Sequence, residues 1–194
     1  MDFTLRLYEP RFNAAIQELF YASVHNISTR FYSPQQLDVW APENTDPLLW
    51  SQRLQDHYTL LAIDRSSDNV VGFGSALCPH QNLNTAEQSY LRQCSQCSLC
   101  SQSMAQPHSV IGLLDHLFVA PAAQGNHIAS ALCHALEKHM QEQHCDLIFV
   151  HASHAAQPVF AHFGYQQIVE LKNDLQGMII TNNLMAKQIL PAKM

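Results

Sequence analysis

Apolar and polar positions recur along the chain with a period that changes several times, and each period predicts a type of element. Residues 3–8 alternate between apolar and polar, as a half-buried strand does. Two apolar runs follow at 58–63 and 70–74, and the turn-forming residues 66–69 lie between them. Two such runs on either side of a turn predict an antiparallel hairpin.

Helical spacing is found in other stretches. Pro10 precedes apolar residues at helical spacing. Ser33-Pro34 and Asp46-Pro47 each place a capping side chain before a proline, which is typical of a helix start. Between 128 and 140 the apolar residues recur every four positions and mark one face of a long helix. We therefore expect short helices before the hairpin and one long helix after it.

The last third of the chain combines strands with helices. Apolar stretches at 111–119 and 147–150 enclose the long helix, and this order predicts a parallel crossover. A short helix over 154–163 is expected next, and then two strands on either side of a turn at Asn173-Asp174. We predict an α+β fold with a mixed, mostly antiparallel central sheet flanked by helices.

Residues 79–109 differ from the rest of the chain in composition. They are rich in Gln, Ser, Asn and Cys, poor in aliphatic side chains, and have no clear period. Such a stretch between two expected strands is typical of an insertion. Because 194 residues suit a single domain, we predict one domain, 1–194, with an insertion at about 79–109.

Charge and composition exclude some classes of protein. The formal net charge is -6, and the Lys and Arg residues are scattered, whereas a nucleic-acid-binding protein shows a basic patch. No apolar run approaches the roughly 18 residues that cross a membrane, and the N-terminus lacks the pattern of a signal peptide. We expect no nucleic acid or membrane partner, and a cytoplasmic protein whose Cys residues are reduced.

The stretch from Leu114 to Ser130 carries the most chemistry. A strand runs into a short loop, and the loop runs into the long helix. Backbone N–H groups at a helix start lack internal partners and attract anions, and the small side chains of Gly125 and Ala129 let a phosphate approach. Taken alone, these residues fit a phosphate site or an ordinary strand-to-helix loop equally well.

Two motifs resemble the GNAT N-acetyltransferase family. Residues 124–129, Gln-Gly-Asn-His-Ile-Ala, resemble its pyrophosphate loop, Arg/Gln-x-x-Gly-x-Gly/Ala, and follow an Ala120-Pro121 step that suits the family. Residues 156–165 resemble its later helix, which ends in an aromatic residue, three further residues, and Gly-Phe. The resemblance implies a GNAT-like acyl-CoA N-acyltransferase fold and transfer of acetyl from acetyl-coenzyme A to a primary amine. His127 stands where the family has a central Gly, and Phe160 where many members have an acidic Tyr.

The resemblance also implies which residues face acetyl-coenzyme A, in the gap where the strands at 111–119 and 145–151 splay apart. Backbone N–H groups around Leu117 would polarise the thioester carbonyl. Attack by the neutral amine is direct, without a covalent enzyme intermediate. The candidate cofactor-binding residues are Leu117, Phe118, Val119, Gln124, Gly125, Asn126, His127, Ile128, Ala129, Ser130, Ser153 and Phe160. Ser153 also suits the cap of the next helix.

Asp115 and His151 are the candidate bases. Asp115 interrupts an apolar strand, and alternation places it on the face opposite His116. The resemblance makes Asp115 the group that draws a proton from the amine through water, although pairing with a Lys or Arg is the simpler reading. His151 follows a buried strand and would lie beside Asp115 if the strands are parallel neighbours.

Tyr32 and Trp40 flank an expected helix in the region where the family forms its acceptor pocket. They are candidates for lining that pocket, and core packing is the alternative reading for Trp40.

The insertion contains three thiols at the spacing of a zinc knuckle. Cys94, Cys97 and Cys100 could bind zinc, with Cys78, His80 or His108 as the fourth ligand. A loop with free thiols is the alternative. Two further Cys, 133 and 145, are expected to be packing residues.

These features leave two hypotheses open. The first is an N-acetyltransferase that acts on a small molecule or peptide. The alternative is a non-catalytic acyl-coenzyme A-binding or metal-sensing regulator on the same fold.

Overall fold

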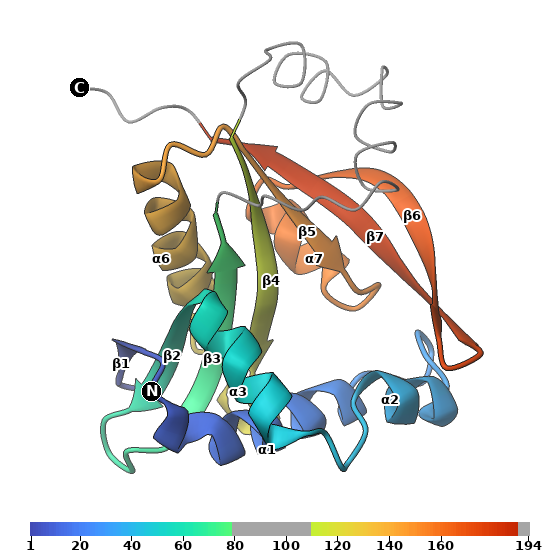
Figure 1. Ribbon diagram of the computed structural model, residues 1–194, viewed down its shortest axis with the longest axis horizontal. Helices are drawn as coiled ribbons and strands as arrows, with labels where there is room; N and C mark the ends of the chain where they lie inside the picture. The colour runs from blue at the N-terminus through green and yellow to red at the C-terminus, as the bar shows by residue number, and fades with distance from the viewer. Residues whose placement is uncertain (79–109, 190–194) are drawn as a thin grey trace. The chain divides into compact units, whose positions relative to one another are not determined.

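The computed structural model describes residues 1–78 and 110–189 (Figure 1). The strands are β1 (Phe3–Leu7), β2 (Tyr58–Asp64), β3 (Val70–Leu77), β4 (Ile111–Val119), β5 (Leu147–Ala152), β6 (Gln166–Leu175) and β7 (Met178–Gln188). The helices are η1 (Pro10–Phe12), α1 (Asn13–His25), α2 (Pro34–Trp40), α3 (Pro47–Asp56), η2 (Pro121–Ala123), α6 (Ile128–Glu142) and α7 (Gln157–His162). Both lists follow the order that the sequence predicts.

The strands form a seven-stranded sheet in the order β1-β2-β3-β4-β5-β7-β6. β1 with β2, β2 with β3, and β5 with β7 are antiparallel, whereas β4 and β5 are parallel over Ile111↔Leu147 to Leu113↔Phe149. The predicted α+β fold with a mixed, mostly antiparallel sheet is therefore confirmed, including the hairpin and the parallel crossover.

The predicted helix starts are confirmed by their caps. The hydroxyl of Ser33 accepts the backbone N–H of Gln36, and the Gln36 side chain accepts the N–H of Ser33, which completes a capping box. The carboxylate of Asp46 accepts the N–H of Leu48. A proline follows each cap in the first turn, where no N–H is needed.

The turn expected at Asn173-Asp174 is wrong by two or three positions. β6 continues through Leu175, and the turn is made by Gln176 and Gly177, with φ values of 55° and 82°. Two consecutive positive φ angles match the twist of a two-residue hairpin loop, and Gly adopts such angles without steric cost. Asp174 instead accepts the N–H of Gly177 (2.7 Å) and holds the turn closed.

The described chain divides into two compact units. The first unit comprises Met1–Ala76, Asp115–Leu136 and Asn173–Ile180. In this unit α1 and α3 pack on one face of the strands, and Phe20, Leu54 and Phe73 meet in the core there. The start of α6 packs on the other face of β3, as Figure 1 shows. A single layer of strands thus has helices on both faces.

The second unit comprises Leu77–Leu114, Glu137–Lys172 and Thr181–Met194. Its core gathers Leu147, Phe149 and Leu184 from β5 and β7. Lys187 donates to both carboxylate oxygens of Glu137 at 2.8 Å, which ties β7 to the end of α6. Apolar packing and this ion pair both stabilise the described part of the unit.

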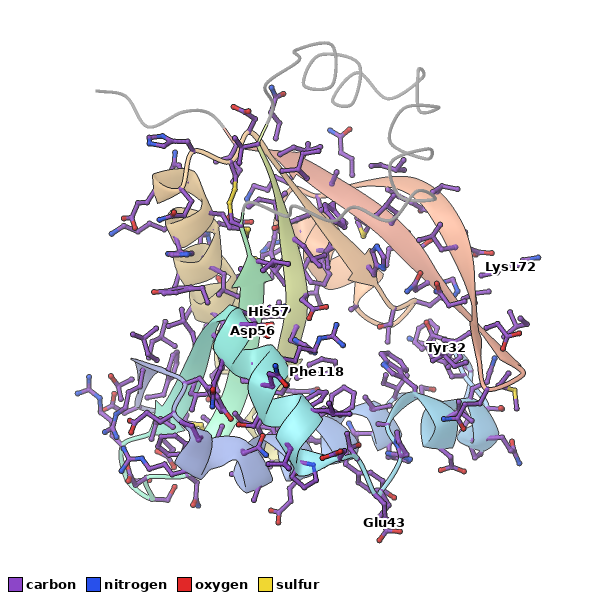
Figure 2. The ribbon with its side chains drawn as sticks, in the orientation of Figure 1. Tyr32, Glu43, Asp56, His57, Phe118 and Lys172 are labelled. Carbon is purple, nitrogen blue, oxygen red and sulfur yellow. A yellow bond between two sulfur atoms is a disulfide. The ribbon has the colours of Figure 1, made fainter. Side chains whose placement is uncertain are left out.

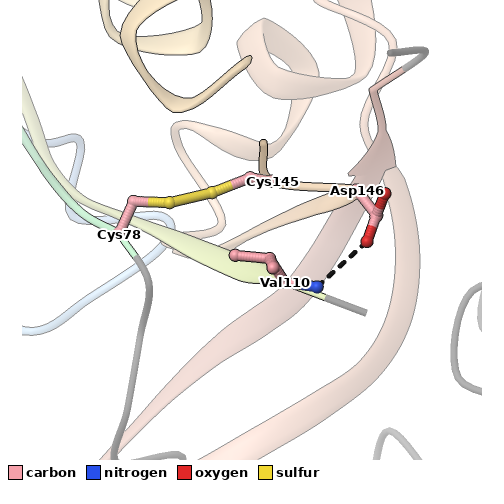
Figure 3. The surroundings of a disulfide bond; sticks show 4 residues. All are labelled: Cys78, Val110, Cys145 and Asp146. Atoms are coloured by element: carbon pink, nitrogen blue, oxygen red, sulfur yellow. Dashed lines mark hydrogen bonds between the residues drawn. A yellow bond between two sulfur atoms is a disulfide. The ribbon is translucent and has the colours of Figure 1, made fainter. Parts of the chain in front are cut away.

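A disulfide joins Cys78 to Cys145 in the second unit (Figure 3). Asp146, the next residue, accepts the backbone N–H of Val110 at 2.9 Å. The expectation of reduced thiols, with Cys145 as a packing residue and Cys78 as a possible zinc ligand, is therefore wrong for this pair. The reason is tertiary: the end of β3 and the turn after α6 meet across 67 residues of sequence. Cys133 is buried and not disulfide-bonded, as expected of a packing residue.

Within residues 1–78 and 110–189, no helix has the length and apolarity that a membrane span requires.

Candidate functional site

The loop between β4 and α6 has an unusual backbone. Gly125 and His127 both adopt positive φ, at 79° and 61°. The left-handed conformation costs a residue with a side chain roughly 1–2 kcal/mol, so His127 is strained where the resembled motif carries Gly. The N–H of Gln124 donates to the carbonyl of Pro121 (3.4 Å), and among the described residues the next such bond of this loop is from Ala131 to His127 (3.0 Å). The N–H groups of residues 125–130 are thus available to an anion.

Two glycines of β3 allow α6, the helix that follows this loop, to pack close to the strand. A Cβ atom on Gly72 would lie 2.8 Å from Cγ2 of Ile128, and one on Gly74 would lie 2.8 Å from Cδ1 of Leu136. Both positions must therefore lack a side chain for α6 to lie this close to the strand. Close packing fixes the start of α6, and with it the direction of the loop N–H groups.

Asp115 lies at the centre of a polar cluster (the Asp115 cluster: Arg53, His57, Ser75, Asp115 and His116). Arg53 Nε donates to Oδ2 of Asp115 at 3.0 Å, and its Nη2 donates to Oδ1 at 2.9 Å. Nδ1 of His57 lies 3.4 Å from Oδ2, and Nδ1 of His116 lies 3.1 Å from it. The hydroxyl of Ser75 lies 2.7 Å from Nδ1 of His116. Figure 2 shows His57 at the end of α3.

Burial and charge act in opposite directions on the pKa of Asp115, and burial outweighs the charge of Asp115 in setting the pKa of His116. Burial raises the pKa of Asp115, but the charges of His116 and Arg53 outweigh it and hold that pKa below its usual value. Burial lowers the pKa of His116 to about 4. At neutral pH the cluster therefore contains an ionised carboxylate beside a neutral His116 ring.

The same side chains form a donor set for a metal ion. One ligand atom each from His57, Asp115 and His116 lies within 4.8 Å of the others, and such a set suits a transition metal. We assign no metal to it, because Arg53 already supplies a cation to both oxygens of Asp115.

The predicted alternation along β4 holds for burial but not for the Asp115 carboxylate. Gly112, Leu114 and His116 are buried, and the residues between them are less so. The carboxylate nevertheless contacts the His116 ring, from which alternation would separate it. Nε and Nη2 of Arg53 donate to both oxygens of the carboxylate there, so the simpler reading, a carboxylate paired with Arg, describes the observed contact.

The other β4 candidates, Leu117 to Val119, belong to the first unit. The ring of Phe118 packs edge-on against Phe20 at 4.9 Å and stacks on Phe73 at 5.5 Å. The carbonyl of Val119 accepts the hydroxyl of Ser23 (3.2 Å). Packing therefore fixes this end of β4 immediately before the loop.

The two aromatic candidates for the acceptor pocket pack together. Tyr32 is 2% exposed and belongs to the core of the first unit, and the half-buried Trp40 meets it edge-on at 5.5 Å. A separate cavity of about 340 Å³ in this unit is lined by residues of α1, α3 and the segment before α3. Its lining includes Glu18, Glu43 and the ring of Trp50.

The remaining candidates lie in the second unit. His151 is the second-last residue of β5, and its ring lies 5.8 Å from that of Phe149. The expectation that Ser153 caps the next helix is wrong: the N-cap of α7 is Ala156, which makes no side-chain cap bond, and the Ser153 hydroxyl accepts the N–H of Ala156 (3.1 Å) in the turn before the helix. Phe160 is 4% exposed, and its ring packs against that of Tyr165 at 5.3 Å. Because Asp115 and His151 belong to different units, their proximity stays a prediction.

The zinc candidates Cys94, Cys97, Cys100, His80 and His108 lie outside the described residues.

Sequence reasoning missed Arg53, His57 and Ser75. Arg53 and His57 stand four positions apart at the end of α3, a spacing that places two side chains on one side of a helix. That signal shows they can act together, but it does not show that Asp115, at position 115, is their partner. Ser75 gives no sequence signal at all, because it is one hydroxyl in an apolar strand.

Comparisons with known proteins agree with the fold described above. A family model described as an acetyltransferase (GNAT) domain matches residues 102–185. The uncharacterized N-acetyltransferase YafP of Escherichia coli K12 is 25% identical over 178 residues, which covers 92% of this chain and 91% of YafP. A GCN5-related N-acetyltransferase structure from Rhodopseudomonas palustris has a TM-score of 0.76 at 24% identity, covering 97% of each chain.

A further structure, the PaiA N-acetyltransferase of Thermoplasma acidophilum in complex with coenzyme A, has a TM-score of 0.66 at 13% identity. It covers 97% of this chain and 100% of its own. The family model, the curated relative and the solved structures together support the GNAT superfamily of acetyltransferases.

Proposed function

We propose that this chain, acting as a single domain, transfers acetyl from acetyl-coenzyme A to a primary amine by direct attack in a ternary complex. The observation that carries the proposal is the loop from Gln124 to Ser130. Its N–H groups precede the first helical hydrogen bond, and its positive φ angles at Gly125 and His127 match a loop that wraps an anion. The pyrophosphate of the cofactor is the anion that this loop would bind.

Asp115 would take the proton from the amine, working through water, and His151 remains the second candidate. The carboxylate is ionised at neutral pH and lies within hydrogen-bonding reach of several N–H groups. Phe160 has no hydroxyl and packs in a core, so the thiolate of coenzyme A would receive its proton from elsewhere. A thiolate is a good enough leaving group for water to serve.

The acceptor would be a cationic amine. The cavity in the first unit carries the carboxylates of Glu18 and Glu43 beside the rings of Phe20, Tyr21 and Trp50. Carboxylates and aromatic faces both attract an ammonium group. The net charge of -6 acts in the same direction at longer range.

The second candidate function, an acyl-coenzyme A-binding regulator without catalysis, is favoured by one specific observation. Phe160 leaves the usual place of the Tyr acid without a proton donor, while the loop conformation needed for cofactor binding is kept. Release of free thiol from acetyl-coenzyme A in the presence of an amine panel separates the two functions.

Calorimetry with acetyl-coenzyme A tests the shared part of both functions. Gly125→Ala should weaken binding by about tenfold or more, because an added Cβ strains the loop and crowds the phosphate. Gly177→Ala is the matched control: both glycines have positive φ, 79° and 82°, and neither added Cβ would meet an atom within 4 Å. The control should bind as tightly as the wild type. No detectable binding by the wild type at millimolar cofactor would overturn both functions.

A further inference from the structure

We propose that Arg53 is the positioning residue for Asp115: its guanidinium binds both carboxylate oxygens and fixes their orientation. The inference rests on the proposed function, in which Asp115 takes a proton. Nothing in the loop motif or the comparisons assigns a role to α3, so the role comes from the contact alone.

The contact between Arg53 and Asp115 is a bidentate hydrogen-bonded ion pair. Nε of Arg53 donates to one oxygen of Asp115 at 3.0 Å and Nη2 donates to the other at 2.9 Å. Two parallel N–H···O bonds fix the plane of a carboxylate as well as its position, which a single bond from Lys does not. The Asp115 side chain is 12% exposed, so little water competes for these lone pairs.

Arg53 is also the permanent cation among the groups that face Asp115. Those groups are Arg53 and His57 from α3 and its end, and His116 from β4, with the uncharged hydroxyl of Ser75 from β3 close by. An imidazole is charged only when protonated, and His116, with a pKa of about 4, is neutral at physiological pH. A guanidinium stays charged at every pH of interest. Without it, the pKa of the Asp115 carboxyl would rise, because burial raises that pKa and one of the charges that oppose it would be gone.

The proton step needs a carboxylate that is both ionised and correctly oriented. The ammonium group R–NH₃⁺ gives one proton through water to the ionised Asp115. The free amine then attacks the acetyl carbon, a C–N bond forms, and the C–S bond breaks. A second proton passes from nitrogen to the departing thiolate, and Asp115 later releases its proton to solvent. A protonated or misoriented Asp115 cannot begin this sequence.

Three variants separate charge from orientation. Arg53→Gln should raise the pH at which the Asp115 carboxyl titrates by about one unit, the lower end of the roughly 1–3 units that a neighbouring cation contributes, because Arg53 is half exposed. Arg53→Lys should return the titration midpoint of Asp115 to its wild-type value but should not return the rate, since Lys cannot form the bidentate pair. Arg11→Gln is the matched control: Arg11 pairs with Glu9 at 2.9 Å on the surface. It should change neither.

A double-mutant cycle on kcat/KM tests whether Arg53 acts through Asp115. Arg53→Gln should lower kcat/KM about tenfold in the wild-type background, because a misplaced group loses up to about 10²-fold. In the Asp115→Asn background it should have no further effect. An equal loss in both backgrounds would overturn the positioning role.

The carboxyl titration is followed by ¹³C NMR and requires no turnover, so the inference and the proposed function fail separately. If no amine is acetylated but the Asp115 titration shifts in Arg53→Gln, the proposed function fails and the electrostatic role of Arg53 stands. If amines are acetylated but the titration midpoint is the same in both proteins, the role of Arg53 is refuted. Should Arg53→Gln fold poorly, Arg53→Lys gives the same comparison on rate alone.

Discussion

The two units of this protein organise their polar interiors differently. The first unit holds a charged group, the Asp115 cluster, in which Arg53 and two imidazoles surround one carboxylate. The second unit holds, besides the ion pair of Lys187 with Glu137, an amide group around Asn183, which is 2% exposed and bonds the side chains of Gln157, Gln167 and His154. A buried charge is costly to desolvate, whereas amides satisfy one another at little cost. The charged cluster therefore points to chemistry, and the amide group to structure.

The units also differ in covalent support, and the largest expected effect comes from breaking it. The disulfide of the second unit closes a loop across 67 residues. Chain entropy gives about 4 kcal/mol of stability for a loop of that length. Cys78→Ser with Cys145→Ser should lower the free energy of unfolding in urea by about that amount.

Cys133→Ala is the control for this pair, because Cys133 forms no disulfide. A reductant should destabilise the wild type and the control alike and leave the double variant unchanged. If the reductant has no effect on the wild type, the disulfide contributes nothing to its stability.

The charged cluster predicts a pH dependence of stability. The pKa of His116 is lowered from 6.5 to about 4 in the folded protein. Between pH 6.5 and 4 the unfolded chain binds a proton at His116 that the folded chain does not bind. The free energy of unfolding therefore decreases as the pH falls from 6.5 to 4, by about 3 kcal/mol in all. Asp115, whose pKa is lowered, contributes stability that is lost only at lower pH, below its usual value of 3.8.

His116→Gln should remove this component. The difference in unfolding free energy between the variant and the wild type, measured by urea denaturation at pH 7.5, 6 and 4.5, should shift in favour of the variant as pH falls. Parallel loss of stability in the two proteins would contradict a buried, neutral His116.

The smallest effect is expected in the amide group of the second unit. Asn183→Ala removes its bonds to Gln167 (2.8 Å) and His154 (3.3 Å). The Gln side chains it leaves are partly exposed and can turn to water, so the cost should be about 1–2 kcal/mol. Thermal unfolding measures it. A cost above the roughly 4 kcal/mol expected for the disulfide would contradict this ranking.

Much of the fold could be predicted because its signals are local. Ser33-Pro34 and Asp46-Pro47 mark helix starts within one turn of chain, and the apolar spacing from 128 to 140 gives the face of α6. The turn between β6 and β7 was misplaced because Asn and Asp favour turns as strongly as Gly does. The turn of the hairpin lies where two consecutive residues, Gln176 and Gly177, adopt positive φ.

The sequence by itself determined the order of the elements, the mixed sheet and the loop at Gln124, because period, caps and small residues act over a few positions. Only the tertiary structure decided which partners Asp115 has and that Cys78 meets Cys145. Arg53 is 62 positions from Asp115, and the two cysteines are 67 apart. Contacts at such separations depend on strand order and on the seating of helices, so no local pattern of residues encodes them.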